Sequence, residues 1–187
     1  MKYSAIIIGG SAGSFKITSR IISSLPTGFP LPVIVCMHRL RNVKTGIISA
    51  LSNNTRIPIC EPYDKDPIIA GKVYIAPANY HLLIEQGIYF SLSTMNPVNH
   101  SRPSIDVTMK SAAGVYNKRL IGILVSGANS DGAEGMLAIH KARGTTLVQD
   151  PEEAEIPSMP EAAIDSFQPD YIYNADKIIK FIEKLNP

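Results

Sequence analysis

Short apolar runs rich in β-branched residues alternate along this chain with longer stretches in which apolar residues recur at helical spacing. Short runs without polar alternation are typical of strands that are buried on both faces of a sheet. The runs that predict strands are residues 5–8, 33–37, 120–125 and 145–148, with weaker candidates at 57–60 and 72–76. The stretches that predict helices are 14–24, 43–51, 104–116, 132–142 and 175–185. A regular alternation of this kind predicts an α/β fold, with a doubly wound, mostly parallel sheet and helices on both faces.

Two segments depart from the alternation of strand and helix. Residues 81–84 and 88–92 flank the sequence Glu85-Gln86-Gly87, which predicts one antiparallel β-hairpin. Residues 150–160 are rich in Pro and Glu and have no periodicity, so we expect a loop of functional length there. Because the sequence has no internal repeat, low-complexity tract or linker, we expect residues 1–187 to form a single domain.

Charge and composition exclude several classes of protein. The formal net charge is only +2 and no dense Lys/Arg block is present, so we expect no binding of nucleic acid. No apolar run approaches the roughly 20 residues of a membrane span, and the one near the N-terminus is too short for a signal peptide. We therefore expect a cytoplasmic protein without membrane insertion. The two cysteines, Cys36 and Cys60, are predicted to be buried free thiols. No Cys or His cluster has zinc spacing, so no metal site is expected.

Residues with catalytic chemistry follow several of the predicted strands. Ser11, His38 and Asp131 each come shortly after the end of one strand. Ligands of an open parallel sheet bind at the carboxyl ends of its strands, so we expect these side chains to meet. A serine nucleophile needs a base, and a histidine base needs a carboxylate that holds its tautomer. The sequence therefore predicts a Ser-His-Asp triad, with Asp150, which follows a fourth strand, as the rival acid.

The sequence around Ser11 fits the G-x-S-x-G pattern of a nucleophile elbow. Residues 9–13 read Gly-Gly-Ser-Ala-Gly, and a helix is predicted directly after them. Flanking glycines allow a tight strand-to-helix turn that exposes the hydroxyl, and a helix N-terminus favours a developing oxyanion. The order Ser, His, Asp differs from the order Ser, Asp or Glu, His of α/β-hydrolases. The pattern therefore indicates either a different triad fold or a chance match.

Non-catalytic interpretations of the same residues stay open at this point. A Gly-rich turn after a first strand is often a phosphate cradle, although Ser11 breaks G-x-G-x-x-G and no Walker A sequence is present. Asp131 precedes a predicted helix, and the free N–H groups at that helix start would keep its carboxylate ionised. The alternative is that Asp131 is only the N-cap of this helix. Asp106 is interpreted as a first-turn helix charge and His140 as a structural helix residue, while His81 could have either role. The alternative to an enzyme is a non-enzymatic α/β module that binds a nucleotide or a protein partner.

Several motifs, in order along nearly the whole chain, resemble the catalytic domain of chemotaxis protein-glutamate methylesterases of the CheB type. The similar stretches are residues 8–13, 37–38, 73–81, 100–107, 122–127 with 131–132, and 149–151 with 158–160. The triad order of that family is Ser, His, Asp, which accounts for the order found here.

The resemblance implies a chemistry and the residues that perform it. Ser11 would attack a glutamate γ-methyl ester, His38 would act as the base, and Asp131 would orient His38. The products would be glutamate and methanol, and glutamine deamidation by the same triad is a secondary expectation. Backbone N–H groups of Ala12 and Ala128 would hold the oxyanion. No metal or organic cofactor is implied.

The resemblance also implies partners. The substrate would be the methylated cytoplasmic helices of a chemoreceptor, and Arg102 is the candidate for a substrate contact. Response regulators of the family carry an N-terminal receiver domain, whereas this sequence starts directly at the first predicted strand. We therefore expect any regulator to be a separate protein.

Overall fold

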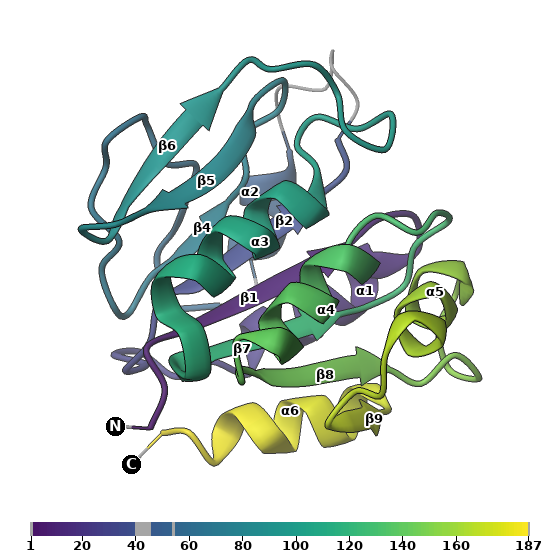
Figure 1. Ribbon diagram of the computed structural model, residues 1–187. Helices are drawn as coiled ribbons and strands as arrows, with labels where there is room; N and C mark the ends of the chain where they lie inside the picture. The colour runs from purple at the N-terminus through teal and green to yellow at the C-terminus, as the bar shows by residue number, and fades with distance from the viewer. Residues whose placement is uncertain (1, 40–45, 54, 187) are drawn as a thin grey trace.

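The computed structural model describes residues 2–39, 46–53 and 55–186 (Figure 1). Within these residues the main sheet has seven strands in the order β3-β4-β2-β1-β7-β8-β9, and β5 pairs with β6 in a separate sheet. The strands are β1 (Ala5–Gly10), β2 (Val33–Met37), β3 (Ile59–Cys60), β4 (Val73–Ile75), β5 (His81–Glu85), β6 (Tyr89–Ser93), β7 (Leu120–Leu124), β8 (Thr145–Gln149) and β9 (Tyr171–Tyr173). The helices are α1 (Ser14–Ser23), α2 (Ile47–Ser52), α3 (Ile105–Tyr116), α4 (Ala133–Lys141), α5 (Ser158–Ser166) and α6 (Ala175–Glu183), with a 3₁₀ helix η1 (Asn117–Arg119).

Strand β1 is the central strand of the main sheet, between β2 and β7. Every pair of neighbouring strands in this sheet is parallel, so the carboxyl ends of the strands share one edge. All six residues of β1 are buried. Ile6 and Ile8 belong to one hydrophobic core, whereas Ala5 and Ile7 belong to the other. Two cores on opposite faces explain why the strand is a continuous apolar run rather than an alternating one.

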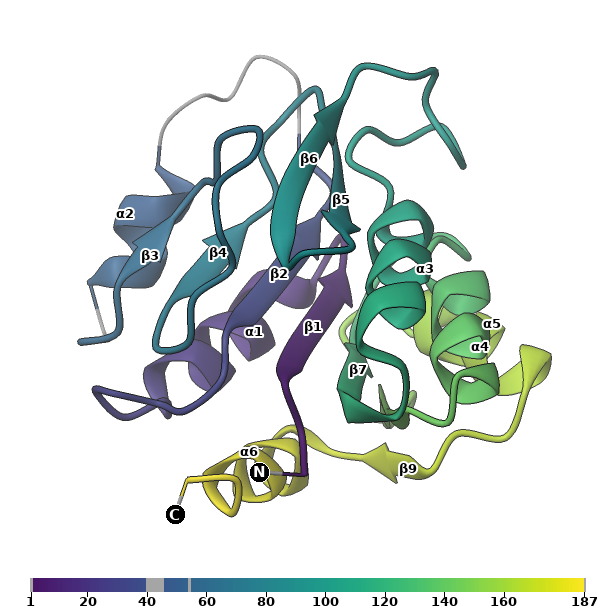
Figure 2. The same ribbon diagram turned by 60° about the vertical axis from the view of Figure 1, so that its left-hand side comes forward.

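Helices cover both faces of the sheet, as the sequence predicts for a doubly wound fold. Residues of α1, α2 and α6 pack into one core, and residues of α3, α4 and α5 pack into the other. Figures 1 and 2 show α3 and α4 side by side on one face, with α1 on the opposite face. None of the helices in the described ranges has the length and apolar character that crossing a membrane requires.

The predicted hairpin is confirmed as β5 and β6, which pair antiparallel from His81 with Ser93 to Glu85 with Tyr89. The hairpin lies beside α3 on the same side of the main sheet (Figure 2). Its Phe90 ring is buried against Tyr74 of β4, with ring centroids 4.8 Å apart. The hairpin therefore adds apolar side chains to the core on the face of the sheet that α3, α4 and α5 cover.

The prediction of an uninterrupted loop over residues 150–160 is wrong, because α5 begins at Ser158. Pro157 and Pro160 are typical of irregular structure, which is why the sequence predicts a loop here. Both lie at the start of α5, where backbone N–H groups have no partner within the helix, so their missing N–H costs no helical hydrogen bond. The helix is held by Met159 and Ala163, which are both fully buried. Two apolar anchors are too few to produce a clear helical period in the sequence.

Three other elements differ from their predicted bounds. Strand β9 was not predicted, because this edge strand has only three residues and none of them is buried. Strand β3 occupies only Ile59–Cys60 of the predicted 57–60. Helix α2 covers Ile47–Ser52, and the first part of the predicted helix 43–51 lies outside the described residues. The strongest strands and the helices α1, α3, α4 and α6 lie within about two residues of their predicted bounds.

The two free thiols differ in burial. Cys36 on β2 is fully buried, and this burial raises the pKa of its thiol to about 12. Cys60 on β3 is only partly buried, which corrects the expectation of two buried thiols. The reason is that β3 is an edge strand of the main sheet.

We expect this difference to appear in thiol labelling of the folded protein with a soluble disulfide reagent near about pH 8. Because the thiolate is the reactive form, Cys60 should react first and Cys36 only after unfolding. A Cys60→Ser variant should then show almost no reaction before denaturant is added. Equal labelling rates of both thiols in the native protein would contradict the burial of Cys36.

Candidate active site

Ser11 lies in the tight turn between β1 and α1, and hydrogen bonds hold this turn on both sides. The Ser11 N–H donates to the carbonyl of Ser126 at 2.9 Å, and the hydroxyl of Ser14 donates to the carbonyl of Ser11 at 2.5 Å. Gly13 caps α1 with a φ of 77°, a left-handed conformation that favours glycine. A Cβ on Gly9 would lie 2.4 Å from a side-chain atom at the start of α3. Gly13 therefore allows the turn into α1, and the missing side chain of Gly9 lets α3 approach β1 closely.

His38 follows β2 and connects Ser11 with Asp131. Its Nδ1 lies 3.0 Å from Ser11 Oγ, and its Nε2 lies 2.7 Å from Asp131 Oδ2. The carboxylate can only accept, so we place the ring proton on Nε2, which leaves Nδ1 free to accept from the Ser11 hydroxyl. The His38 side chain is 15% exposed, whereas the Asp131 side chain is 0% exposed. The site is thus open to solvent at the imidazole and closed at the carboxylate.

Asp131 accepts several hydrogen bonds besides the one from the imidazole. Its Oδ2 accepts from the N–H of Ile105 at 2.7 Å. Its Oδ1 accepts from the N–H of Asp106 at 3.1 Å, the hydroxyl of Ser104 at 2.9 Å and the amide Nδ2 of Asn99 at 3.0 Å. Both carboxylate oxygens are therefore fixed in direction, and the imidazole is bound by a rigid group.

The electrostatics of Asp131 favour the ionised form. Burial alone would raise its pKa, but the hydrogen bonds from His38, from two backbone N–H groups and from Asn99 lower it below the ordinary aspartate value. The backbone donors are the first N–H groups of α3, not of the helix that follows Asp131 in the sequence. The N-cap of α4 is Gly132, with no side-chain cap, so the interpretation of Asp131 as a simple N-cap is wrong.

Asp106 lies in the first turn of α3 as predicted, but it does more than add charge to the helix start. It is 4% exposed, and its Oδ1 accepts from the N–H groups of Gly132 at 2.9 Å and Gly135 at 2.7 Å. The starts of α3 and α4 are thus joined reciprocally. The Asp131 carboxylate, which precedes α4, accepts from N–H groups of α3, and the Asp106 carboxylate of α3 accepts from N–H groups at the start of α4. Burial raises the pKa of Asp106, and the nearby charge of Asp131 adds to that increase. These reciprocal hydrogen bonds fix the loop that carries Asp131.

Asn99 and Ser104 were not predicted as members of the site. Ser104 is visible in the sequence as a helix cap, and its hydroxyl accepts from the N–H of Val107. A serine cap with an aspartate in the first turn is common at helix starts. This pattern in the sequence therefore does not indicate that Ser104 donates to Asp131, which is distant in the sequence. Asn99 lies in a loop without any periodic signal.

The turn of Ser11 and the loop of Asp131 are joined by Ser126. Its buried hydroxyl lies 2.9 Å from the carbonyl of Ala12 and accepts from the N–H of Ile156 at 2.9 Å. The neighbouring N–H of Gly127 donates to the carbonyl of Ile156. By contrast, no hydrogen bond found within the described residues uses the N–H of Ala12 or of Ala128. Both residues are exposed at the edge of the sheet that carries Ser11.

Two of the other histidines, His81 and His140, have structural contacts. His81 is 1% exposed, and its ring nitrogens lie 3.0 Å from the carbonyl of Asn96 and 3.3 Å from the N–H of Ser104. Both nitrogens are thus occupied by backbone groups, which decides the open question about His81 in favour of a structural role. His140 lies in α4 and its ring packs against Phe167 at 5.1 Å between centroids, as predicted.

Two further candidate residues make contacts away from His38. Asp150 accepts from the N–H of Glu152 at 3.1 Å, in the turn after β8. Arg102 donates from Nη1 to the carbonyls of Thr94 at 2.7 Å and Met95 at 3.0 Å. Arg102 thus anchors the segment after β6, and its substrate contact remains a prediction.

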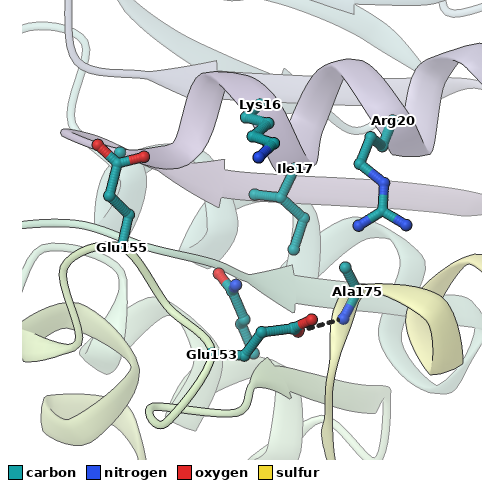
Figure 3. Close-up of a pocket in the computed structure, with 8 residues that line it drawn as sticks. Lys16, Ile17, Arg20, Glu153, Glu155 and Ala175 are labelled. Carbon is teal, nitrogen blue, oxygen red and sulfur yellow. Dashed lines mark hydrogen bonds between the residues drawn. The ribbon is translucent and has the colours of Figure 1, made fainter.

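A pocket of about 330 Å³ lies next to the Gly-rich turn, between α1 and the loop after β8 (Figure 3). Lys16 and Arg20 contribute positive charge, but Glu153 and Glu155 line the same pocket. The Glu153 carboxylate accepts from the N–H of Ala175 at 2.6 Å. Two carboxylates would oppose the phosphates of a nucleotide, so this lining does not favour the phosphate-cradle interpretation.

Comparison with known proteins places these observations in a family. A family model described as CheB methylesterase matches residues 6–182. A relative from Leptospira interrogans is 42% identical over 186 residues, covering 100% of this chain and 96% of the relative. A protein-glutamate methylesterase/protein-glutamine glutaminase from Carboxydothermus hydrogenoformans is 36% identical over 165 residues, covering 86% of this chain and 48% of the relative.

A solved structure gives the same result for the fold. The crystal structure of the Thermotoga maritima CheB methylesterase catalytic domain matches with a TM-score of 0.93 and 28% sequence identity. The match covers 99% of this chain and 100% of that one. A family model over nearly the whole chain, relatives of high coverage and a shared fold together show that this chain belongs to the CheB methylesterase family.

Proposed function

We propose that the protein is a serine hydrolase that demethylates glutamate γ-methyl esters of chemoreceptors, giving glutamate and methanol. The observation that carries this proposal is the continuous hydrogen-bonded chain from Ser11 Oγ through His38 to Asp131 at the edge of the sheet. The names of the relatives support the same reaction and favour it over a non-enzymatic binding module. Family membership implies an ester substrate, and the chain of contacts supplies the groups that ester hydrolysis needs.

The reaction proceeds in two halves. Ser11 Oγ attacks the ester carbonyl while its proton moves to Nδ1 of His38, and the ionised Asp131 stabilises the imidazolium. The imidazolium then gives that proton to the leaving methoxide, and methanol departs from the acyl-enzyme. In the second half, Nδ1 takes a proton from water as the water oxygen attacks the acyl carbon. The bond from that carbon to Ser11 Oγ then breaks, the imidazolium returns the proton to Oγ, and glutamate is released. Protons move only between Ser11, His38, the leaving methoxide and water, and Asp131 stays ionised throughout.

The oxyanion of each tetrahedral intermediate binds the N–H groups of Ala12 and Ala128. Their N–H groups are the candidates because neighbouring N–H groups, those of Ser11 and Gly127, already donate to carbonyls. Such donors act where charge develops, and removing one typically costs about 10²- to 10³-fold in turnover. Glutamine deamidation is a second reaction of the same site, and the relatives named protein-glutamine glutaminase favour it.

The remaining expectations belong to the same proposal. Residues 1–187 form a single methylesterase-type catalytic domain that acts in the cytoplasm on methylated receptor helices. Arg102 contacts the substrate through the part of its guanidinium that the carbonyls of Thr94 and Met95 leave unused. Neither a metal nor an organic cofactor takes part, and a separate protein regulates the activity.

Methanol release from a methylated receptor peptide tests the reaction directly, because a binding module would release none.

Two carboxylates compete for the third place in the triad, and substitution separates them. Asp131→Asn should lower turnover by roughly 10³- to 10⁴-fold, because an amide N–H facing Nε2 favours the wrong tautomer of His38. Asp150→Asn should cost about tenfold or less, since its contact shapes only its own turn. Turnover of a methylated receptor peptide by the two purified variants measures both. An inactive Asp150→Asn beside a nearly normal Asp131→Asn would remove Asp131 from the mechanism.

A further inference from the structure

Asn99 forms a bridge between the two buried carboxylates of the site. Its Nδ2 lies 2.9 Å from Asp106 Oδ2 and 3.0 Å from Asp131 Oδ1. An amide nitrogen has two hydrogens, one for each acid. The opposite orientation of the amide would place its oxygen against two carboxylates, so the contacts fix which end faces inward. Asn99 itself is exposed, whereas Asp106 and Asp131 are 4% and 0% exposed.

The turn that carries Asn99 is held in an unusual backbone conformation. Val98 and Ser101 exchange backbone hydrogen bonds of 3.1 and 2.9 Å, and the two residues between them, Asn99 and His100, have φ values of 50° and 59°. Two positive φ values are typical of a type I′ turn, in which asparagine is favoured at the first position. Positive φ in residues other than glycine often marks a functional constraint. Here the turn places the Asn99 amide over the carboxylates.

The two carboxylates need this donor because they repel each other. Asp131 loses its role if it binds a proton, since a neutral acid does not stabilise the imidazolium. Assuming the triad proposed above, we propose that Asn99 is a positioning residue that keeps Asp131 ionised and directed at His38 by donating to both acids. Among the described residues no side-chain hydrogen bond is found from Asn99 to Ser11 or His38, so Asn99 acts through Asp131.

Other groups also contribute to the charge around the two acids. The titratable and charged side chains near them are His38 and Cys36 from the β2 strand and its end, His81 of β5, Lys110 of α3 and Glu134 of α4. Lys110 pairs with Glu134 at 3.8 Å, and the charge of Lys110 lowers the pKa of Asp106. Asn99 is a neutral side-chain donor that hydrogen-bonds both acids at once.

The test measures how fast a fluorophosphonate labels Ser11 as a function of pH in the full chain. Asn99→Gly removes the amide but suits the positive φ, so the turn should survive. Loss of the donor raises the pKa of the carboxylate pair, so a proton binds at a pH where the wild-type pair is ionised. We expect the acid limb of the labelling profile to move up by about one to two pH units, so the loss grows toward acid and vanishes toward about pH 9. Asn99→Asp adds a third carboxylate and should shift the acid limb further.

A matched control is Asn117→Gly, because Asn117 is also an exposed asparagine with positive φ, 49°, at the far end of α3. Its labelling profile should equal that of the wild type. If the wild type is not labelled at Ser11, the proposed function fails. If the wild type is labelled but the Asn99 variants lose nothing, or lose the same factor at every pH, the role of Asn99 alone is overturned.

Discussion

Replacing Ser11 with alanine is expected to lower turnover of a methylated receptor peptide by about 10⁴-fold or more. The alanine lacks the only atom that can form the acyl-enzyme, so no other group in the site can replace it. The fold should change little, because the turn is held by the backbone of Ser11 and not by its hydroxyl. Thermal unfolding of the variant, measured beside turnover, separates lost chemistry from lost structure.

Ser126 and Ser130 are the neighbouring serines that could be confused with the nucleophile. The Ser126 hydroxyl is buried and hydrogen-bonded to the backbone, so Ser126→Ala should lower the stability of the fold and should affect turnover only through that loss. Ser130→Ala should be close to neutral, since its residue is exposed. A fully active Ser11→Ala together with an inactive, folded Ser130→Ala would move the nucleophile to the Asp131 loop.

The second large effect is expected for His38→Gln, which should also lower turnover by about 10⁴-fold or more. Glutamine can fill the space but cannot accept the serine proton and return it, so both halves of the reaction lose their base. Nδ1 can accept the serine proton because the ring proton lies on Nε2, which faces Asp131. Hydrogen bonds lower the pKa of Asp131 below the ordinary aspartate value, so this carboxylate should stay ionised near about pH 7.

The other histidines of known contact provide controls for this result. His140→Gln should stay active, since its ring only packs against Phe167. His81→Gln should mainly destabilise the protein, because both ring nitrogens hold backbone groups. An inactive but fully folded His81→Gln beside an active His38→Gln would show that the base is misassigned.

The fold was largely predictable because its buried strands are continuous apolar runs. Strand β1 is buried on both faces, so composition alone separates it from an amphipathic helix. The elements that were missed carry little of this signal. Helix α5 has two prolines at its start and few apolar anchors, and β9 is a short edge strand without a buried residue.

The candidate site was predictable only where the topology determines it. Parallel strands bring their carboxyl ends to one edge, and this rule predicts Ser11, His38 and the two candidate acids, Asp131 and Asp150, at that edge. Only the structure shows that Asp131 is the acid that meets His38. The donors to Asp131 follow no such rule. They come from α3 and from the turn of Asn99, 25 to 32 residues away in the sequence, and depend on how two helix starts meet. Such contacts depend on tertiary packing and leave no local pattern.

The most direct test of the proposed mechanism is the site of covalent labelling in the wild-type protein. A fluorophosphonate should form one stable adduct per chain, and peptide mass mapping should place it on Ser11. The reagent needs an activated serine beside its base, and only Ser11 has its hydroxyl 3.0 Å from an imidazole nitrogen among the described contacts. An adduct on Ser126 or Ser130, or no adduct on a protein that releases methanol from the receptor peptide, would contradict the assignment of Ser11 as the nucleophile.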